Sequence, residues 1–283
     1  MRRPPEDLYL ELMKKTLSFT LWPDPPIPVD VLNYRGSPAK RSVLKRALFS
    51  LISALLRNTK LRLVEDRSLT PEQRAEGRTW SSYGDTMIGL KRLDSLQRCI
   101  ETVLKQAIPG DFIETGAWRG GASIFMRAVL AAYGIADRRI FVADSFQGLP
   151  KPDTAKWPVD RRSTFHIHPF LAISEDEVRS NFRKYDLLDD QVVFLPGWFS
   201  DTLPSAPIEQ LAILRFDGDM YGSTMDVLTN LYPKLSKGGF CIIDDYGLRR
   251  CQQAVDDFRA SNHITAEITR VDWTGIVWRK GED

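Results

Sequence analysis

Two short apolar runs, each ending at acidic residues, dominate the second half of the chain. Leu211–Phe216 and Phe240–Ile243 are rich in Leu, Ile and Phe, and Ser223–Leu235 between them carries apolar residues at helical spacing. Apolar runs of this length, flanked by turn residues, are typical of buried parallel strands. A strand, a helix and a strand in this order form a crossover that makes the two strands parallel, so both are expected to end at the same edge of a sheet.

The acidic residues that follow the two runs predict a cation site at that edge. Asp217 and Asp219 follow the first run, and Asp244 and Asp245 follow the second. Open α/β sheets bind their ligands at the carboxyl ends of the strands. Four carboxylates in one crevice repel one another unless a positive charge lies among them, and a hard divalent cation takes oxygen ligands. Helix capping and turn formation are the alternative roles, which explain one acid at this edge but not four.

A glycine-rich turn predicts a second ligand site. Asp111–Thr115 has the pattern of a strand, it runs into E-T-G-A-W-R-G-G-A-S, and Ser123–Ala132 continues as a helix, an order that brings backbone N–H groups close to a ligand. From Gly116 the pattern is G-x-x-x-G-G and not G-x-G-x-x-G, which favours one nucleoside over a dinucleotide. A further strand, Arg139–Ala143, ends at Asp144, which either binds both hydroxyls of a ribose or caps the next turn.

The remaining elements follow from similar patterns. Periodicity predicts five more helices, one more strand and a final hairpin: Asp7–Leu17, Ser42–Arg57, Thr86–Gln106, Ser174–Lys184 and Cys251–Ala260; Val192–Leu195; and Glu267–Val271 with Gly275–Arg279. Ser145–Pro169 is long, proline-rich and aromatic, which predicts a lid or substrate loop that carries His166 and His168. Trp198, after a glycine turn, is expected either to lie against a flat adenine or to belong to the core.

The first 75 or so residues differ in composition from the rest. Between Val31 and Val64 there are eight basic residues and no acidic ones. The helix predicted at Ser42–Arg57 has a wide apolar side, which would pack on the core or on a second subunit, or else lie on an anionic membrane surface. Packing against protein is favoured, because Ser50 and Ser53 interrupt the apolar pattern. We therefore predict that residues 1–75 form a helical extension that acts as a cap, a lid or a dimer contact.

Composition changes this picture little but excludes several classes of protein. The chain of 283 residues is 43% hydrophobic and 27% charged, and its net charge of +2 provides no general attraction to nucleic acid. The three cysteines lack the spacing of a metal site, which favours a reducing, cytoplasmic setting. The N-terminus has no apolar signal sequence, and no apolar run approaches the ~18 residues of a membrane span. We expect a cytoplasmic protein that binds no nucleic acid.

Five segments together resemble the macrocin O-methyltransferase family, which includes sugar O-methyltransferases of antibiotic tailoring. These segments are E-T-G-A-W-R-G-G-A, D-S-F-Q-G-L-P, G-W-F-S-D-T-L-P, D-G-D-M-Y-G-S-T and I-I-D-D-Y, and the resemblance covers roughly Tyr83 to Arg279. It implies a Rossmann-like Class I methyltransferase domain at residues 76–283. That domain would have a seven-stranded, mostly parallel sheet, an antiparallel last strand and helices on both faces.

The resemblance also implies cofactors and roles for individual residues. S-adenosylmethionine and Mg²⁺ would be bound, with Asp217, Asp244 and Asp245 as metal ligands and Asp217 or Asp219 as the catalytic base. Cofactor contacts are expected from Thr86, Glu114, Thr115, Gly116, Ala117, Gly120, Asp144, Ser145, Gly197, Trp198, Ser200 and Asp217.

The acceptor that the resemblance implies is a sugar hydroxyl of a glycosylated small molecule. A homo-oligomer is a separate expectation, in which the N-terminal helices would join copies of the chain. Two other classes of protein are compatible with parts of this pattern. One is a non-catalytic protein that binds the adenosyl cofactor or acts as a membrane-surface scaffold. The other is a phosphate-handling enzyme, which is disfavoured because the chain contains no G-x-x-x-x-G-K-[ST].

Overall fold

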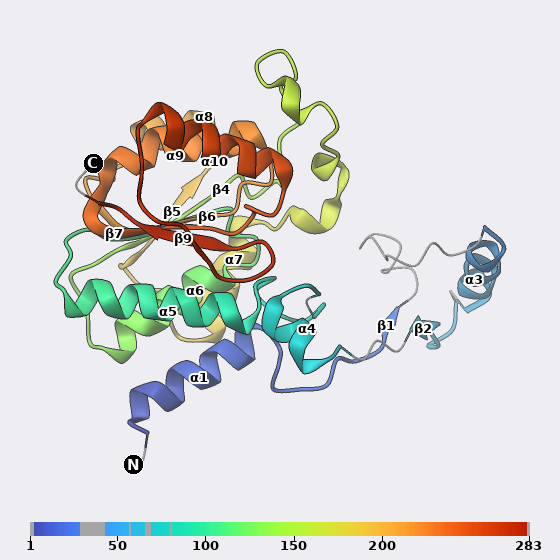
Figure 1. The fold of residues 1–283 in the computed structure, drawn as a ribbon. Helices are drawn as coiled ribbons and strands as arrows, with labels where there is room; N and C mark the ends of the chain where they lie inside the picture. The colour runs from blue at the N-terminus through green and yellow to red at the C-terminus, as the bar shows by residue number, and fades with distance from the viewer. Residues whose placement is uncertain (1–2, 29–42, 57, 66–68, 80, 282–283) are drawn as a thin grey trace.

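The computed structural model describes residues 3–28, 43–56, 58–65, 69–79 and 81–281 (Figure 1). In these residues one seven-stranded sheet has the order β5-β4-β3-β6-β7-β9-β8. The five strands from β5 to β7 are parallel, β9 is antiparallel to β7, and β8 is antiparallel to β9. The strands are β3 Asp111–Thr115, β4 Ile140–Asp144, β5 Val192–Pro196, β6 Leu211–Phe216, β7 Leu235–Ile243, β8 Thr269–Arg270 and β9 Ile276–Arg279. The predicted mostly parallel sheet with an antiparallel last strand is confirmed.

Helices cover both faces of this sheet, as predicted (Figure 1). One face carries α5 Leu90–Lys105, α6 Gly121–Ala132 and α7 Glu175–Lys184, and the other carries α8 Phe199–Thr202, α9 Tyr221–Leu231 and α10 Arg249–Ser261. Successive side chains of a strand point to opposite faces, so Phe112 and Ile113 belong to two separate hydrophobic clusters. Every residue of β6 is buried, because a strand covered on both faces leaves no side exposed to water.

Most predicted boundaries agree with the structure to within a few residues, and the differences have local causes. α5 begins at Leu90 and not at Thr86, because Gly89 before it has an extended backbone and the Thr86 hydroxyl accepts a hydrogen bond from the N–H of Ile88. α9 ends at Leu231, and Tyr232–Lys234 continues as a 3₁₀ turn. Proline at position 233 has no N–H for a helical hydrogen bond, which explains this end.

The first helix of the predicted N-terminal extension packs on the body of the molecule. α1 Pro5–Leu17 buries Leu10 and Leu17 completely, in the same hydrophobic cluster as residues of α5 and α6. α4 Pro71–Glu76 lies close to the start of α5 and ends at a left-handed Gly77. The division of the chain at residue 75 therefore stays a prediction, because α1 shares the core that follows it.

The second N-terminal helix lies apart from the sheet. α3 Val43–Leu56 sits beyond a short antiparallel pair of β1 Ile27–Pro28 and β2 Val64–Glu65 (Figure 1). Leu48, Leu51 and Leu55 are more than half exposed. The expectation that this helix packs on the core is not met in the single chain, whereas packing on a second subunit stays a prediction. Ser42, Arg57 and residues 31–41 of the basic stretch lie outside the described residues.

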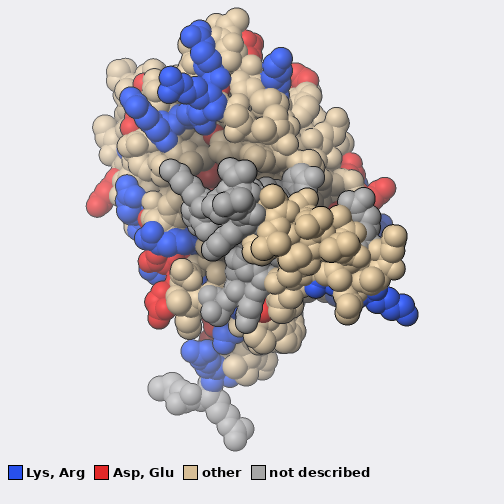
Figure 2. Space-filling model, turned by 90° about the vertical axis from the view of Figure 1, so that its right-hand side faces the viewer, with Lys and Arg blue, Asp and Glu red and all other residues tan. Residues whose placement is uncertain are grey.

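The surface on the side of α3 is mixed in charge (Figure 2). Lys and Arg side chains gather on the upper part of this face, and a patch of uncharged residues lies to the right of its centre. None of the helices in the described parts of the chain is long and apolar enough to cross a membrane. All three cysteines, Cys99, Cys241 and Cys251, are buried free thiols.

Candidate active site

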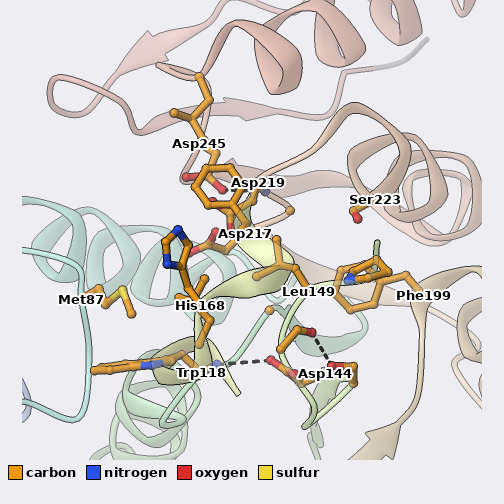
Figure 3. Close-up of a pocket in the computed structure, with 18 of the residues that line it drawn as sticks. Met87, Trp118, Asp144, Leu149, His168, Phe199, Asp217, Asp219, Ser223 and Asp245 are labelled. Atoms are coloured by element: carbon orange, nitrogen blue, oxygen red, sulfur yellow. Dashed lines mark hydrogen bonds between the residues drawn. The ribbon is translucent and has the colours of Figure 1, made fainter. Parts of the chain in front are cut away.

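A cavity of about 610 Å³ lies at the carboxyl ends of the parallel strands. Its walls come from the loops after β3 to β7, from the long loop between β4 and α7, and from the turn before β9 (Figure 3). The predicted site residues on these walls are Gly116, Asp144, Ser145, Gly197, Trp198, Ser200, Asp217, Asp219 and Asp245. The apolar runs predicted that ligands bind at the edge of the sheet where these strands end, and the cavity lies at that edge.

Asp144 holds the glycine-rich turn against the end of β4. Its Oδ2 accepts hydrogen bonds from the backbone N–H of Ala117 at 2.8 Å and of Trp118 at 3.3 Å, while its Oδ1 accepts one from Phe146 at 2.8 Å. Burial raises the pKa of this carboxyl and the hydrogen bonds oppose the rise. The capping role that was weighed for Asp144 is therefore present, and the residue still lines the cavity.

Gly116 at the start of this turn has no room for a side chain. Its φ of 83° lies in the left-handed region, and a Cβ there would collide with the carbonyl oxygen of Asp217. The glycine-rich turn after β3 therefore passes directly over the loop after β6. This contact places the glycine-rich turn and the loop that carries Asp217 and Asp219 at the same cavity.

Five predicted cofactor residues do not line the cavity: Thr86, Glu114, Thr115, Ala117 and Gly120. Glu114 is buried behind the wall, where its carboxylate pairs with Arg215 and accepts a hydrogen bond from Ser123. Ala117 presents its N–H to Asp144, and Gly120 is the left-handed cap of α6. Direct contact of these five residues with a cofactor stays a prediction.

Three carboxylates meet on one side of the cavity (Figure 3). Asp217, Asp219 and Asp245 each place an oxygen within 4.8 Å of the oxygens of the other two. The backbone N–H of Asp219, a residue with a φ of 54°, donates to Asp245 Oδ2 at 3.0 Å, which keeps the two loops together. This cluster of three carboxylates is defined here as the acidic cluster.

Burial and mutual repulsion raise the pKa of each carboxylate in the acidic cluster. Burial and then Asp245 raise the pKa of Asp217 well above its ordinary value. Burial and then Asp217 do the same to Asp219, and burial with Asp219 raises the pKa of Asp245 to about 6. Three convergent carboxylate oxygens in such a setting are a suitable donor set for a hard, oxygen-binding divalent cation such as Mg²⁺. The residues present thus fit the predicted metal.

Asp244, predicted as a metal ligand, lies beside the acidic cluster and not within it. Its Oδ2 pairs with Arg215, and Arg92 Nη1 lies 3.4 Å from the same oxygen. Side chains of consecutive residues point in opposite directions at the end of a strand, so Asp244 turns toward α5 while Asp245 lines the cavity. The other oxygen of Asp244, Oδ1, is buried without a hydrogen-bond partner. A ligand role for Asp244 stays a prediction, and Oδ1 is the oxygen available for it.

Sequence reasoning missed much of the cavity wall. The wall also includes Met87, Ile88, Leu149, Pro150, Phe165, Phe170, Leu171, Phe199, Leu248 and Trp273. Only the long aromatic loop had been singled out, and of its two histidines His168 lines the cavity while His166 is exposed. Arg92 and Arg215 were missed as well, although one signal existed, because Arg215 is a charged residue within the apolar run of β6.

A family model described as Macrocin-O-methyltransferase (TylF) matches residues 6–280. The chain belongs to this family. The 8-demethyl-8-(2,3-dimethoxy-alpha-L-rhamnosyl)-tetracenomycin-C 4'-O-methyltransferase of Streptomyces olivaceus is 47% identical over 280 residues, which are 99% of this chain and 95% of that protein. The demethyldecarbamoylnovobiocin O-methyltransferase of Streptomyces niveus is 45% identical over 275 residues, 96% of this chain and 93% of that protein.

A solved structure agrees with these sequence comparisons. The O-methyltransferase NovP has a TM-score of 0.82 and 44% identity, and the match covers 98% of this chain and 100% of that one. The resemblance to macrocin O-methyltransferases and the predicted fold class are therefore confirmed, and the chain is an O-methyltransferase. A purely non-catalytic scaffold is excluded as the main interpretation.

Proposed function

We propose that this macrocin O-methyltransferase family member transfers a methyl group from S-adenosylmethionine to a sugar hydroxyl of a glycosylated small molecule, with Mg²⁺ as its metal. The observation that carries the proposal is the acidic cluster, which faces the same cavity as the glycine-rich turn and Asp144. A methyl donor and a metal-held acceptor would therefore meet in one enclosed space. The tetracenomycin relative supports a sugar acceptor, since its name specifies a rhamnosyl group.

The cofactor site is assigned to the turn after β3 and the ends of β4 and β5. Gly116 allows the backbone to approach a ligand, Asp144 is available to ribose hydroxyls, and Trp198 and Phe199 offer flat surfaces to a base. When bound, S-adenosylmethionine supplies a sulfonium methyl group. These residues bind and orient the donor but take no covalent part in the transfer.

The acidic cluster is the place for the metal. Asp217, Asp219 and Asp245 would hold Mg²⁺, with Oδ1 of Asp244 as a further candidate oxygen. When bound, Mg²⁺ orients a hydroxyl and lowers its pKa. Mg²⁺ prefers six oxygen ligands, so a site built from three or four protein oxygens leaves positions for acceptor oxygens.

The proton of the acceptor hydroxyl needs a base inside the cavity. As the acceptor oxygen gains the methyl group, its proton moves to a carboxylate oxygen of Asp219 or Asp217, the two candidate bases that line the cavity. The two electrons of the broken S–CH₃ bond stay on the sulfur, so charges and atoms balance.

The long loop provides a wall for the rest of the acceptor. Leu149, Phe165, Phe170 and Leu171 line the cavity with apolar surface, and His168 lies among them. Such a wall excludes water from the reacting atoms and suits a largely apolar aglycone. We therefore place the sugar near the acidic cluster and the aglycone against this loop.

The test is methyl transfer to a panel of glycosides with neighbouring hydroxyls, in Mg²⁺ and in EDTA. Asp217→Asn is expected to lower methyl transfer at least ~100-fold, which corresponds to about 2.7 kcal/mol of transition-state stabilisation. Affinity for S-adenosylhomocysteine should change only a few-fold, because Asp217 acts mainly on the acceptor side. Asp137→Asn is the matched control, since Asp137 is exposed and does not line the cavity. Full activity in EDTA would contradict the metal part of the proposal and leave the methyltransferase assignment standing.

A further inference from the structure

A continuous series of buried polar contacts runs behind the acidic cluster. Ser123 donates to Glu114, Glu114 pairs with Arg215, and Arg215 pairs with Asp244. Arg92 Nη1 lies 3.4 Å from Asp244 Oδ2, and Arg92 Nε donates to Asp272 Oδ2 at 2.8 Å. Every member of this series is less than a tenth exposed. These residues join α6, the end of β3, the ends of β6 and β7, α5 and the turn before β9.

The sheet register explains why these charges meet. Glu114 is opposite Arg215, and Arg215 is opposite Ile242, so the three side chains share one face of the sheet. Asp244 lies two residues beyond Ile242 and therefore points to the same face. α5 packs on that face and brings Arg92 to Asp244. Arg215 and Arg92 thus reach Asp244 from the sheet and from a helix.

Both arginines hold the same oxygen of Asp244. Arg215 Nη2 and Arg92 Nη1 face Oδ2, whereas the buried Oδ1 has no hydrogen-bond partner. An unpaired carboxylate oxygen in a buried position is unfavourable unless a ligand satisfies it. Asp244 directly precedes Asp245 of the acidic cluster, so a cation bound at that cluster would be a suitable partner for this oxygen.

The other end of Arg92 reaches the cavity wall. Asp272 Oδ1 accepts hydrogen bonds from the backbone N–H of Thr274 at 3.0 Å and of Gly275 at 2.7 Å, which shapes the turn. Trp273 and Thr274 of this turn line the cavity. Burial alone would lower the pKa of Arg92, but Asp244 and Asp272 raise it, so the guanidinium stays charged between the two carboxylates.

We propose that Arg92 is a positioning residue for the cation site. Together with Arg215 it fixes Oδ2 of Asp244, so that Oδ1 serves as a further cation ligand. Through Asp272 it ties that ligand to the turn that carries Trp273 and Thr274. A planar guanidinium can hold two carboxylates at once, which an ammonium group cannot do in the same geometry. The inference rests on the proposed function, because it requires a divalent cation at the acidic cluster.

The experiment measures Mn²⁺ binding to the full chain by electron paramagnetic resonance, with Mn²⁺ as the probe in place of Mg²⁺. Arg92→Met is expected to weaken Mn²⁺ binding at least tenfold, the usual effect of losing a group that orients a metal ligand. Arg92→Lys keeps the charge and should recover only part of this loss. Arg127→Met is the matched control, because Arg127 is another buried arginine, paired with Asp189, and neither residue lines the cavity, so it should leave Mn²⁺ binding unchanged.

Two further readouts separate positioning from a general loss of structure. Affinity for S-adenosylhomocysteine should stay within a few-fold in Arg92→Lys, while the KM for the acceptor rises, because the Trp273 turn loses its anchor. If both Arg92 variants bind Mn²⁺ as tightly as the wild type, or if Arg127→Met weakens binding equally, the inference is wrong. If the wild type itself binds no Mn²⁺, the metal part of the proposed function fails, and the inference fails with it.

Discussion

Replacing Asp245 with asparagine is expected to stabilise the metal-free protein at pH 8, even though the change removes a residue of the acidic cluster. Burial and the neighbouring Asp219 raise the pKa of Asp245 from 3.8 to about 6 in the folded chain. Folding therefore carries a free-energy penalty whenever this carboxyl must be ionised. Asparagine is neutral at every pH, and its side-chain oxygen can still accept the hydrogen bond from the N–H of Asp219.

The size of the effect follows from the shift in pKa. The change in the pKa of Asp245 from 3.8 to about 6 corresponds to about 3 kcal/mol, because one pKa unit is worth 1.36 kcal/mol. Because the folded pKa lies above the unfolded one, the penalty is absent well below pH 4, where both states are protonated. It grows as the pH rises through about 6 and is complete above that value. At pH 5 it amounts to roughly half of its full size.

Thermal unfolding in EDTA at pH 5 and pH 8 is the assay. At pH 8 the melting temperature of Asp245→Asn should exceed that of the wild type by roughly 6–12 °C, given the usual 2–4 °C per kcal/mol for a chain of this size. Added Mg²⁺ should raise the melting temperature of the wild type much more than that of the variant, since binding to the folded state stabilises it. The exposed Asp137 provides the control substitution Asp137→Asn, for which no such gain is expected.

The reasoning would be refuted by equal melting temperatures of wild type and Asp245→Asn at pH 8 in EDTA. A gain that is larger at pH 5 than at pH 8 would refute it as well, because the sign of the linkage would then be reversed. A gain at pH 8 together with lost methyl transfer would show that the acidic cluster is kept at the expense of stability.

Three further predictions concern the cofactor, the loop and the N-terminal helix. Asp144→Asn replaces a carboxylate oxygen that accepts hydrogen bonds from the N–H groups of the glycine-rich turn. Calorimetry should therefore show at least tenfold weaker binding of S-adenosylhomocysteine, a loss of about 1.4 kcal/mol in binding free energy. Unchanged affinity would contradict the assignment of Asp144 to the cofactor site. In Gly222→Ala the new Cβ would lie 2.6 Å from Cδ1 of Trp157, a residue of the long loop, so the loop would have to shift. Steady-state kinetics should then show a higher KM for the acceptor with cofactor affinity retained. An unchanged KM would mean that the loop does not form the acceptor wall. If the N-terminal helices join two copies, the double variant Leu51→Glu and Leu55→Glu should sediment as a smaller species than the wild type, and identical sedimentation would exclude α3 from the contact.

The sequence by itself determined the sheet and the edge that carries the site. Leu211–Phe216 forms β6 with the predicted bounds, and β3 likewise spans Asp111–Thr115. Apolar runs reveal buried strands because both faces of a central strand must be covered. The crossover rule then places the acids after β6 and β7 at one edge, which is why Asp217 and Asp245 were correctly expected near each other.

Only the tertiary structure decided which oxygens face the cavity and what stands behind them. Asp244 and Asp245 are neighbours in the sequence, but opposite side-chain directions send the first to two arginines and the second to the cavity. Arg92 comes from α5 and Asp272 from the last turn, so nothing in the local pattern of either residue reveals their contact. The position of α3 is a similar case, because periodicity shows that a helix has an apolar side but not what covers it. Local patterns report what a segment prefers, whereas the partner of each charged or apolar side chain depends on segments that are distant in the chain and meet only in the folded protein.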